Sequence, residues 1–256
     1  MLGPLEALLA AVDRADPDRR LLFAGDYVNR GPDSRGVLDL LVALDRARFV
    51  RGNHDDILDL IVNGSGRVPQ LINDPGVAVQ WFFDQGLVPT LESYGADYFG
   101  IESVAARPSH AGIRHVTDGI PTAHRSFLHE LPLVLEEDDL FVCHASWAID
   151  EPDDHVAAKV GADESLKRIV LWNRFADAEV AAVKRWRRTG YFGHTPVTNY
   201  LPDTATDLVP VTGPNVVLVD TAAALGPAGR LTAWCHEEDR YLQATRDGRI
   251  VEGRRA

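Results

Sequence analysis

The first part of the chain alternates between amphipathic stretches and short apolar runs. Apolar side chains recur at helical spacing over residues 4–12 and again over about 32–44, and each stretch opens on a residue suited to a helix start. Residues 21–24 and 47–50 are apolar runs with the length of a buried strand, and a third helix is expected over 55–61. This order predicts a right-handed β-α-β unit at the head of an α/β fold.

The pattern changes after residue 63. Residues 63–109 are rich in Gly, Pro and aromatic residues, and we interpret them as a mostly helical, cap-like insertion bordering the substrate cleft. Its aromatic side chains are expected to form the core of that insertion, namely Trp81, Phe82, Phe83, Tyr94, Tyr98 and Phe99. Further along, helices are predicted over 123–131, up to residue 172 and near 180–186, and strands over 133–136, 140–143, 191–192, 216–219, 231–235 and 241–242.

Composition describes an ordinary globular chain. The 256 residues are 45% hydrophobic and 25% charged, and no repeat or linker divides them, so we expect one domain spanning residues 1–256. The formal net charge of -12 argues against nucleic acid and anionic membranes as partners. A phosphate group must then be bound locally by a few arginines. Only Cys143 and Cys235 are present, and we expect a soluble, cytoplasmic protein without disulfides.

Polar clusters follow each of the early strands, where α/β proteins place their chemistry. The segment from Gly25 to Gly31 follows the first strand, and Arg51 to Asp55 follows the second. Asp26 is the candidate to bridge two cations in a phosphoester hydrolase, and Asn53 offers an amide oxygen to one of them. Gly-Asp and Gly-Asn are also generic turn sequences.

Histidines and arginines add to this pattern. His144 and His194 each follow a later apolar strand, and four polar strand ends in one chain favour a metal site over isolated histidines. His54 suits a general acid that protonates the leaving group, although it could equally cap the following helix. Arg30 and Arg51 offer planar forks for a phosphate. The remaining histidines are interpreted as structural.

At this point the sequence resembles the calcineurin-like metallophosphoesterase superfamily, specifically the bacterial and phage (lambda-type) serine/threonine phosphatases. Four motifs of that family occur in order between residues 25 and 196: Gly-Asp-x-Val-Asp-Arg-Gly with one change, Arg-Gly-Asn-His-Asp, Val-x-His-Ala and Gly-His-Thr-Pro. Residues 169–174 are similar to the Trp-Asn-Arg segment of the lambda-type enzymes, and 217–221 with 229–232 are similar to the closing strands.

The resemblance implies a fold and a set of roles. The fold would be two mixed β-sheets packed face to face and flanked by helices, a four-layer α/β arrangement. One or two divalent ions are implied, with Mn²⁺ the first choice and Fe or Zn²⁺ as alternatives. The implied metal ligands are Asp26, Asn53, His144 and His194; the phosphate ligands are Arg30, Arg51 and Arg174; and the catalytic residues are His54 and Asn29.

Two departures from the family pattern bear on activity. Aligning Gly3 with the first motif places Leu2 where a metal-binding His is expected and leaves the Asp upstream of Met1, so the domain is expected to be N-terminally incomplete. Asn29 replaces the carboxylate that pairs with the general-acid histidine, which removes a charge that would raise an imidazole pKa. Both changes predict reduced activity.

The sequence is compatible with three functions. The first is a phosphomonoesterase similar to the serine/threonine phosphatases, in which metal-bound hydroxide attacks the phosphorus of a phosphoprotein or a small phosphate ester. The second is symmetrical hydrolysis of dinucleoside tetraphosphates, which relatives with the same motifs perform. The third is a catalytically impaired relative with a binding or regulatory role.

Overall fold

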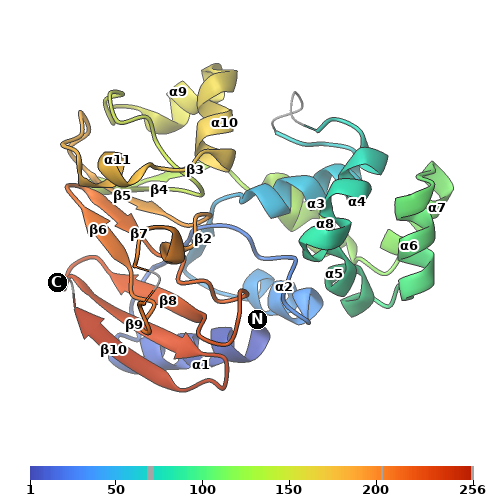
Figure 1. Ribbon diagram of the computed structural model, residues 1–256, viewed down its shortest axis with the longest axis horizontal. Helices are drawn as coiled ribbons and strands as arrows, with labels where there is room; N and C mark the ends of the chain where they lie inside the picture. Colours follow the sequence, from blue (N-terminus) through green and yellow to red (C-terminus); the bar gives the residue numbers. More distant parts are fainter. Residues whose placement is uncertain (68–71, 203, 255–256) are drawn as a thin grey trace. The chain divides into compact units, whose positions relative to one another are not determined.

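The computed structural model describes residues 1–67, 72–202 and 204–254. The chain folds into two compact units, and Figure 1 shows their elements in the colours of the sequence. The first unit comprises residues 1–24, 46–50 and 133–256, and the second comprises 25–45 and 51–132. The insertion expected over 63–109 lies within the second unit, and the expected single domain stays a prediction.

A five-stranded mixed sheet forms the centre of the first unit. Its order is β3 (Val134–Glu136), β4 (Leu140–Cys143), β5 (Thr189–Phe192), β7 (Val216–Leu218) and β6 (Val211–Gly213). The three central strands run parallel, and the two edge strands are antiparallel to their neighbours. The strands β4 and β5 therefore end at the same edge, and both predicted strand-end histidines follow them directly.

Side chains alternate between the two faces of this sheet, as the period of a β-strand requires. Phe141 and Phe192 pack on one face with Val160 of α9 (Val156–Ala162) and Val170 of α10 (Glu164–Trp172). Val142, Tyr191 and Val217 pack on the other face, against Leu22 and Trp234. The sheet is thus covered by helices on one side and by further strands on the other.

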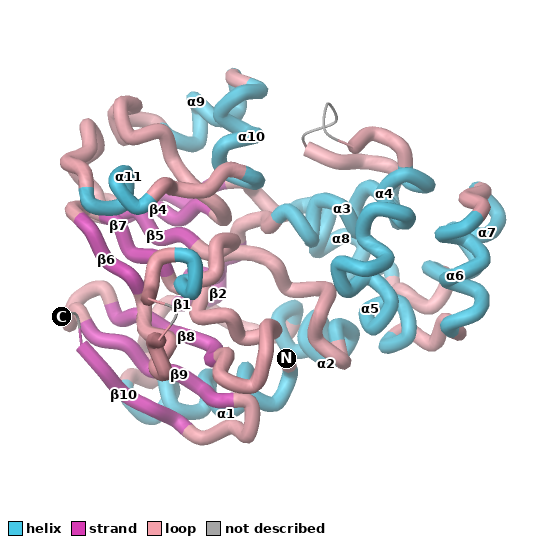
Figure 2. The backbone as a smooth tube through the Cα atoms, viewed as in Figure 1, coloured by secondary structure: helices cyan, strands magenta, loops and turns pink. Residues whose placement is uncertain are grey.

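Those further strands form two small sheets. In one, β1 (Leu21–Phe23) pairs in parallel with β2 (Ala47–Phe49), as the early β-α-β pattern predicts. In the other, β8 (Arg230–Cys235), β9 (Arg240–Thr245) and β10 (Ile250–Arg254) form an antiparallel meander covered by α1 (Leu2–Ala15). Figure 2 shows these strands gathered with the five-stranded sheet and the helices outside them. The predicted α/β class with stacked sheets is confirmed.

The helix predicted over 180–186 is wrong. Here α11 (Asp177–Ala181) stops early, and Ala182 is already extended. Trp186 lies fully buried in the core instead, and its indole N–H donates to the carbonyl oxygen of Asn215 at 3.0 Å. Tertiary packing of this one large side chain overrides the helical spacing of its neighbours. The strands β6 and β10 were not predicted.

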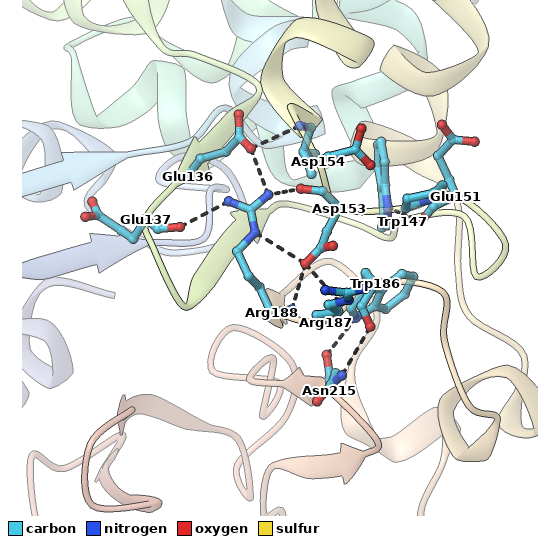
Figure 3. Close-up of polar contacts among 12 residues, drawn as sticks. Glu136, Glu137, Trp147, Glu151, Asp153, Asp154, Trp186, Arg187, Arg188 and Asn215 are labelled. Atoms are coloured by element: carbon cyan, nitrogen blue, oxygen red, sulfur yellow. Dashed lines mark hydrogen bonds and ion pairs between the residues drawn. The ribbon is translucent and has the colours of Figure 1, made fainter.

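A network of charged groups fixes the start of β5, as Figure 3 shows. The Arg188 guanidinium donates to Glu136 at 2.8 Å and to Asp153 at 3.3 Å. Glu136 also accepts the backbone N–H groups of Val156 and Ala157 at the beginning of α9. Although burial acts to raise it, the bonds from Arg188, Ala157 and Val156 hold the pKa of Glu136 below its usual value. The network thereby ties α9 to the strands that precede both histidines.

The second unit is helical in its described residues, and the cap-like role expected of residues 63–109 stays a prediction. It contains α2 (Ser34–Val42), α3 (Asn53–Asn63), α4 (Pro75–Phe82), a π-helical turn η1 (Phe83–Leu87), α5 (Val88–Ser93), α6 (Tyr98–Ala106), α7 (His110–Thr117) and α8 (Thr122–Glu130). In η1, the Gly86 carbonyl accepts the Arg30 N–H at 3.0 Å. A Cβ on Gly86 would lie 2.3 Å from that nitrogen, so only glycine fits.

The aromatic residues of this unit are only partly core residues. Phe82 and Tyr94 are buried as expected, but Trp81, Tyr98 and Phe99 are 63%, 43% and 78% exposed. The expectation that the whole set forms a core is therefore wrong for these three. None of the helices in the described part of the chain is both long and apolar enough to cross a membrane.

Candidate active site

The loop after β1 holds three predicted site residues in an unusual backbone conformation. Asp26, Asn29 and Arg30 have φ values of 61°, 69° and 62°, in the left-handed region that side chains other than glycine rarely adopt. Such conformations persist only where the surroundings fix them, and they cluster at functional sites. The contacts that fix this loop come from the second polar segment, residues 51–55, and from Gly86 and Thr90 of the second unit.

Asp55 provides two of those contacts. Its carboxylate is fully buried and accepts the backbone N–H groups of Asp26 at 2.8 Å, Tyr27 at 2.9 Å and Gly52 at 2.8 Å. The Asp26 carboxylate in turn accepts the N–H of His54 at 3.0 Å. A Cβ on Gly52 would lie 2.2 Å from Asp26 Oδ1, so a glycine is needed for the two segments to approach this closely.

Asp55 was not among the residues predicted for the site. Its signal was present, because an acidic residue three positions after a helix N-cap is the pattern of a capping box. Here Gly52 is the N-cap of α3 and Asp55 is the third helical residue. Its role exceeds a cap, since two of its three bonds reach across to the other segment.

His54 and Asn29 lie in direct contact. His54 occupies the first turn of α3, is buried, and packs its ring edge-on to Phe82 at 5.1 Å. Its Nδ1 lies 2.8 Å from the Asn29 amide nitrogen. Asn29 is also buried, and it bonds to Thr90 through both its backbone N–H and its amide oxygen. The structure therefore brings the two residues predicted as catalytic into direct contact, and Thr90, which was not predicted as a site residue, bonds to one of them.

Arg51 does not occupy a position from which it could bind phosphate. It is fully buried, and its guanidinium donates to Asp56 at 3.0 Å and Asp59 at 2.8 Å. The remaining bonds go to the backbone carbonyls of Leu128, His129 and Leu131. A guanidinium has five N–H donors, and these five bonds use all of them. We therefore correct the predicted phosphate role of Arg51 to a structural one.

The two histidines that follow β4 and β5 lie together in the first unit. The rings of His144 and His194 are 5.1 Å apart between centroids and inclined at 73°. His144 is buried, and its Nδ1 lies 2.7 Å from the carbonyl oxygen of Ala24. A carbonyl at that distance fixes the ring proton on Nδ1 and makes Nε2 the nitrogen with the lone pair. A backbone carbonyl behind a ring nitrogen is the usual support of a metal-binding histidine.

The remaining predicted residues differ in exposure and in the elements that carry them. Arg30 is exposed at the loop after β1, and Arg174 is exposed two residues beyond the end of α10. Asn53 is the first residue of α3 and is buried. His194 is partly exposed and, with a φ of 63°, shares the left-handed backbone of Asp26.

The residue types predicted as metal ligands suit a divalent metal ion. Two imidazoles, one carboxylate and one amide oxygen are intermediate ligands that suit Mn²⁺, Fe or Zn²⁺. The pattern of the His144 ring, held by a carbonyl on one nitrogen, supports this fit independently of any relative.

Comparison with known proteins places these features in a class. Stacked sheets with histidines at parallel strand ends suit metal-dependent phosphoester hydrolysis, and the model of the calcineurin-like phosphoesterase family matches residues 1–209. The chain belongs to the calcineurin-like phosphoesterase family.

Similar curated proteins match over short stretches. A symmetrical bis(5'-nucleosyl)-tetraphosphatase of Legionella pneumophila is 43% identical over 63 residues, which are 24% of this chain and 23% of that protein. The one from Ralstonia nicotianae is 51% identical over 56 residues, 21% of this chain and 19% of that protein. The chain thus spans about a fifth of the length of these relatives.

Among solved structures, a metallophosphoesterase from Sphaerobacter thermophilus is 20% identical, with a TM-score of 0.47 over 98% of this chain and 81% of that one.

Proposed function

We propose that the protein is a divalent-metal-dependent hydrolase that cleaves dinucleoside tetraphosphates symmetrically. The observation that carries metal dependence is the pair of histidines at the ends of β4 and β5, with His144 held by the Ala24 carbonyl. The substrate class is supported by the names of the relatives matched in the comparison. A small dinucleotide also suits an acidic protein whose exposed candidate phosphate ligands are few.

The proposed metal ligands are Asp26, Asn53, His144 and His194. Asp26 follows Ala24 by two residues in the chain, and the Ala24 carbonyl bonds to His144. Asn53 starts the helix whose next residue donates its N–H to the Asp26 carboxylate. A bound divalent cation would supply Lewis acidity to the phosphoryl group.

The other residues have roles in binding and orientation. Arg30 and Arg174 are proposed to bind the phosphate oxygens through their planar, charged forks. His54 would donate a hydrogen bond to the leaving oxygen, and Asn29 orients its ring. The reaction adds one water to diadenosine tetraphosphate and yields two ADP molecules, because the bond that breaks is the central phosphoanhydride.

The test separates this reaction from its alternatives by the products. With Mn²⁺ present, chromatography is expected to show ADP alone from diadenosine tetraphosphate; AMP with ATP would contradict symmetrical cleavage. Replacing His194 by Ala is expected to abolish Mn²⁺ binding in calorimetry and turnover together. The matched control is His115→Ala, which removes an exposed histidine of α7 and is expected to leave both unchanged.

A phosphomonoesterase acting on phosphoproteins is the second candidate. It is supported by the motif set between residues 25 and 196, including the Trp-Asn-Arg segment that ends at Arg174. Phosphoserine peptide turnover exceeding that of diadenosine tetraphosphate would favour it. Metal binding without turnover of either substrate would favour an impaired relative with a binding role.

A further inference from the structure

Aromatic side chains gather at one end of a helix pair in the second unit. The helices α4 and α6 lie side by side (Figure 1). They run antiparallel. Pro108, just after α6, lies against Gly76 near the start of α4, whereas Phe83, just after α4, contacts Tyr98 at the start of α6. The end of α4 and the start of α6 therefore share one end of the pair.

Three of the rings at this end contact one another in series. The ring centroids of Phe83 and Tyr98 are 6.2 Å apart, and those of Tyr98 and Phe99 are 6.0 Å apart, both in edge-on geometry. Trp81 precedes Phe83 by two residues and belongs to the same end of the pair. We call Trp81, Phe83, Tyr98 and Phe99 the aromatic patch. Val77, one turn before Trp81, is also exposed and extends the apolar surface along α4.

The patch is not a poorly packed core. Phe82, which lies between two of its members, is buried together with Ala78 and Val79, so α4 presents a complete apolar face to the interior. Trp81 lies outside that face and is 63% exposed, while Phe99 is 78% exposed. Contiguous exposed apolar surface of this kind marks an interaction site on a folded protein.

The surroundings of the patch are acidic. Residues 72–106 contain five acidic residues and no Lys, Arg or His. Among the acidic residues, Asp84, Asp97 and Glu102 are exposed and lie within three residues of a ring of the patch. Even with Arg30, which contacts η1, these three carboxylates leave the local charge negative.

Rings and carboxylates together select the chemistry of the ligand. An arginine guanidinium stacks on an aromatic face and pairs with a carboxylate, so it satisfies both features at once. Apolar side chains beside it would cover the remaining ring surface. A nucleobase can also stack on such rings, but the same carboxylates would repel the phosphates it carries, as they would an anionic membrane.

We propose that the aromatic patch is a docking surface for a basic segment of a partner protein, one that carries arginine beside apolar side chains. The charge complementarity of the patch and its exposed rings carry this inference. It goes beyond the proposed hydrolysis and does not depend on it, because it concerns binding at residues that we assign no role in the reaction.

Peptide binding tests the proposal. The probe is a fluorescent amphipathic peptide with leucine on one face and arginine on the other, and its counterpart has glutamate in place of every arginine. Fluorescence anisotropy is expected to show binding of the arginine peptide and none of the glutamate peptide at the same concentration. Trp81→Ser and Phe99→Ser are each expected to raise the dissociation constant about tenfold, as for an aromatic hot spot. Asp84→Asn is expected to raise it about threefold, the size of an exposed charge pair.

Two control variants separate the patch from the general acidity of the protein. Val183→Ser replaces an 86% exposed apolar side chain of the first unit, and Asp18→Asn removes an exposed carboxylate there. Both are expected to bind the arginine peptide as the wild type does, and circular dichroism checks that every variant is folded. Equal binding of the two peptides would overturn the proposal, as would wild-type binding by both Trp81→Ser and Phe99→Ser.

Two further measurements address other occupants of the patch. Calorimetry with ADP is expected to give the same affinity for Phe99→Ser as for the wild type; ADP binding lost in this variant would assign the patch to a nucleotide instead. Sedimentation is expected to show the same oligomeric state for both proteins. Self-association abolished by Phe99→Ser would assign the patch to a second copy of the chain and would likewise overturn the proposal.

Discussion

The Asp55 carboxylate joins the two polar segments that contain Asp26 and Asn53. One buried carboxylate accepts three backbone N–H groups from two separate segments. Bonds to a charged acceptor are shorter and stronger than those between neutral groups. The position of Asp26, and with it the proposed metal site, depends on this carboxylate.

Replacing Asp55 by Ala is expected to destabilise the protein by about 3 kcal/mol or more, because three backbone N–H groups, two of them in buried bonds, lose their acceptor. Urea unfolding measures the change. Calorimetry of the folded fraction is also expected to show weaker Mn²⁺ binding. Asp18→Ala removes an exposed carboxylate paired with Arg46 and serves as the control, with no measurable effect. Equal stability of the two variants would contradict this structural role of Asp55.

Among the elements, α3 and α8 are joined by the buried Arg51. Its five bonds link the acidic residues of α3 to the carbonyls at the end of α8. Burial has the largest effect on the pKa of Asp56 and raises it, although the charge of Arg51 lowers it. A charged group this deep is expensive to leave without its partner.

Arg51→Ala is therefore expected to cost about 3–5 kcal/mol of unfolding free energy, the range for breaking a buried ion pair. The KM of the remaining folded enzyme is expected to match the wild type, because Arg51 is fully buried and its N–H groups are all bonded within the protein. Arg174→Ala should behave in the opposite way, with unchanged stability and a raised KM. A raised KM in Arg51→Ala at normal stability would restore the phosphate role.

The junction of α2, α5 and α8 contains a buried histidine. His124 Nδ1 lies 2.9 Å from the Tyr94 hydroxyl, and its Nε2 lies 3.1 Å from an Asp39 carboxylate oxygen. Burial lowers the pKa of His124 below its ordinary value of 6.5, against the opposing pull of Asp39. The charge of Arg35 also lowers the His124 pKa. The unfolded chain therefore binds a proton at a pH where the folded protein does not.

Stability is expected to be complete above the unfolded pKa of 6.5 and to fall as the pH drops through and below it. Urea midpoints measured from about pH 7.5 down to about pH 5.5 should record the loss. In His124→Gln the slope over this range should be smaller. His115→Asn, at an exposed position, should keep the wild-type slope; a reduced slope there as well would assign the effect to histidines in general.

At the scale of the whole molecule, charge opposes the proposed substrate. The net charge of -12 repels a tetraphosphate, and the two proposed phosphate ligands, Arg30 and Arg174, must bind it at short range. Raising NaCl about tenfold screens the long-range repulsion while affecting close contacts less. The kcat/KM for diadenosine tetraphosphate is therefore expected to rise relative to that for p-nitrophenyl phosphate, which carries less charge. A steep fall would instead indicate steering by a basic surface.

The sequence predicted much of this molecule, for reasons that differ by element. The parallel pair β1 and β2 and the strands β4 and β5 follow from apolar runs that end at polar residues, a local signal. The end of α11 depends on where Trp186 packs, and the burial of Arg51 depends on carboxylates of the following helix. Such pairings are set by the tertiary fold, so residue type and spacing alone could not reveal them.

The left-handed backbone at Asp26, Asn29, Arg30 and His194 also bears on how this protein can evolve or be engineered. Each such residue costs of order 1–3 kcal/mol, which glycine at the same position would largely avoid. Selection for thermal resistance alone would therefore favour glycine at positions whose side chains we propose to take part in the chemistry. A stabilised version of this enzyme must be sought elsewhere in the chain, with these four positions held fixed.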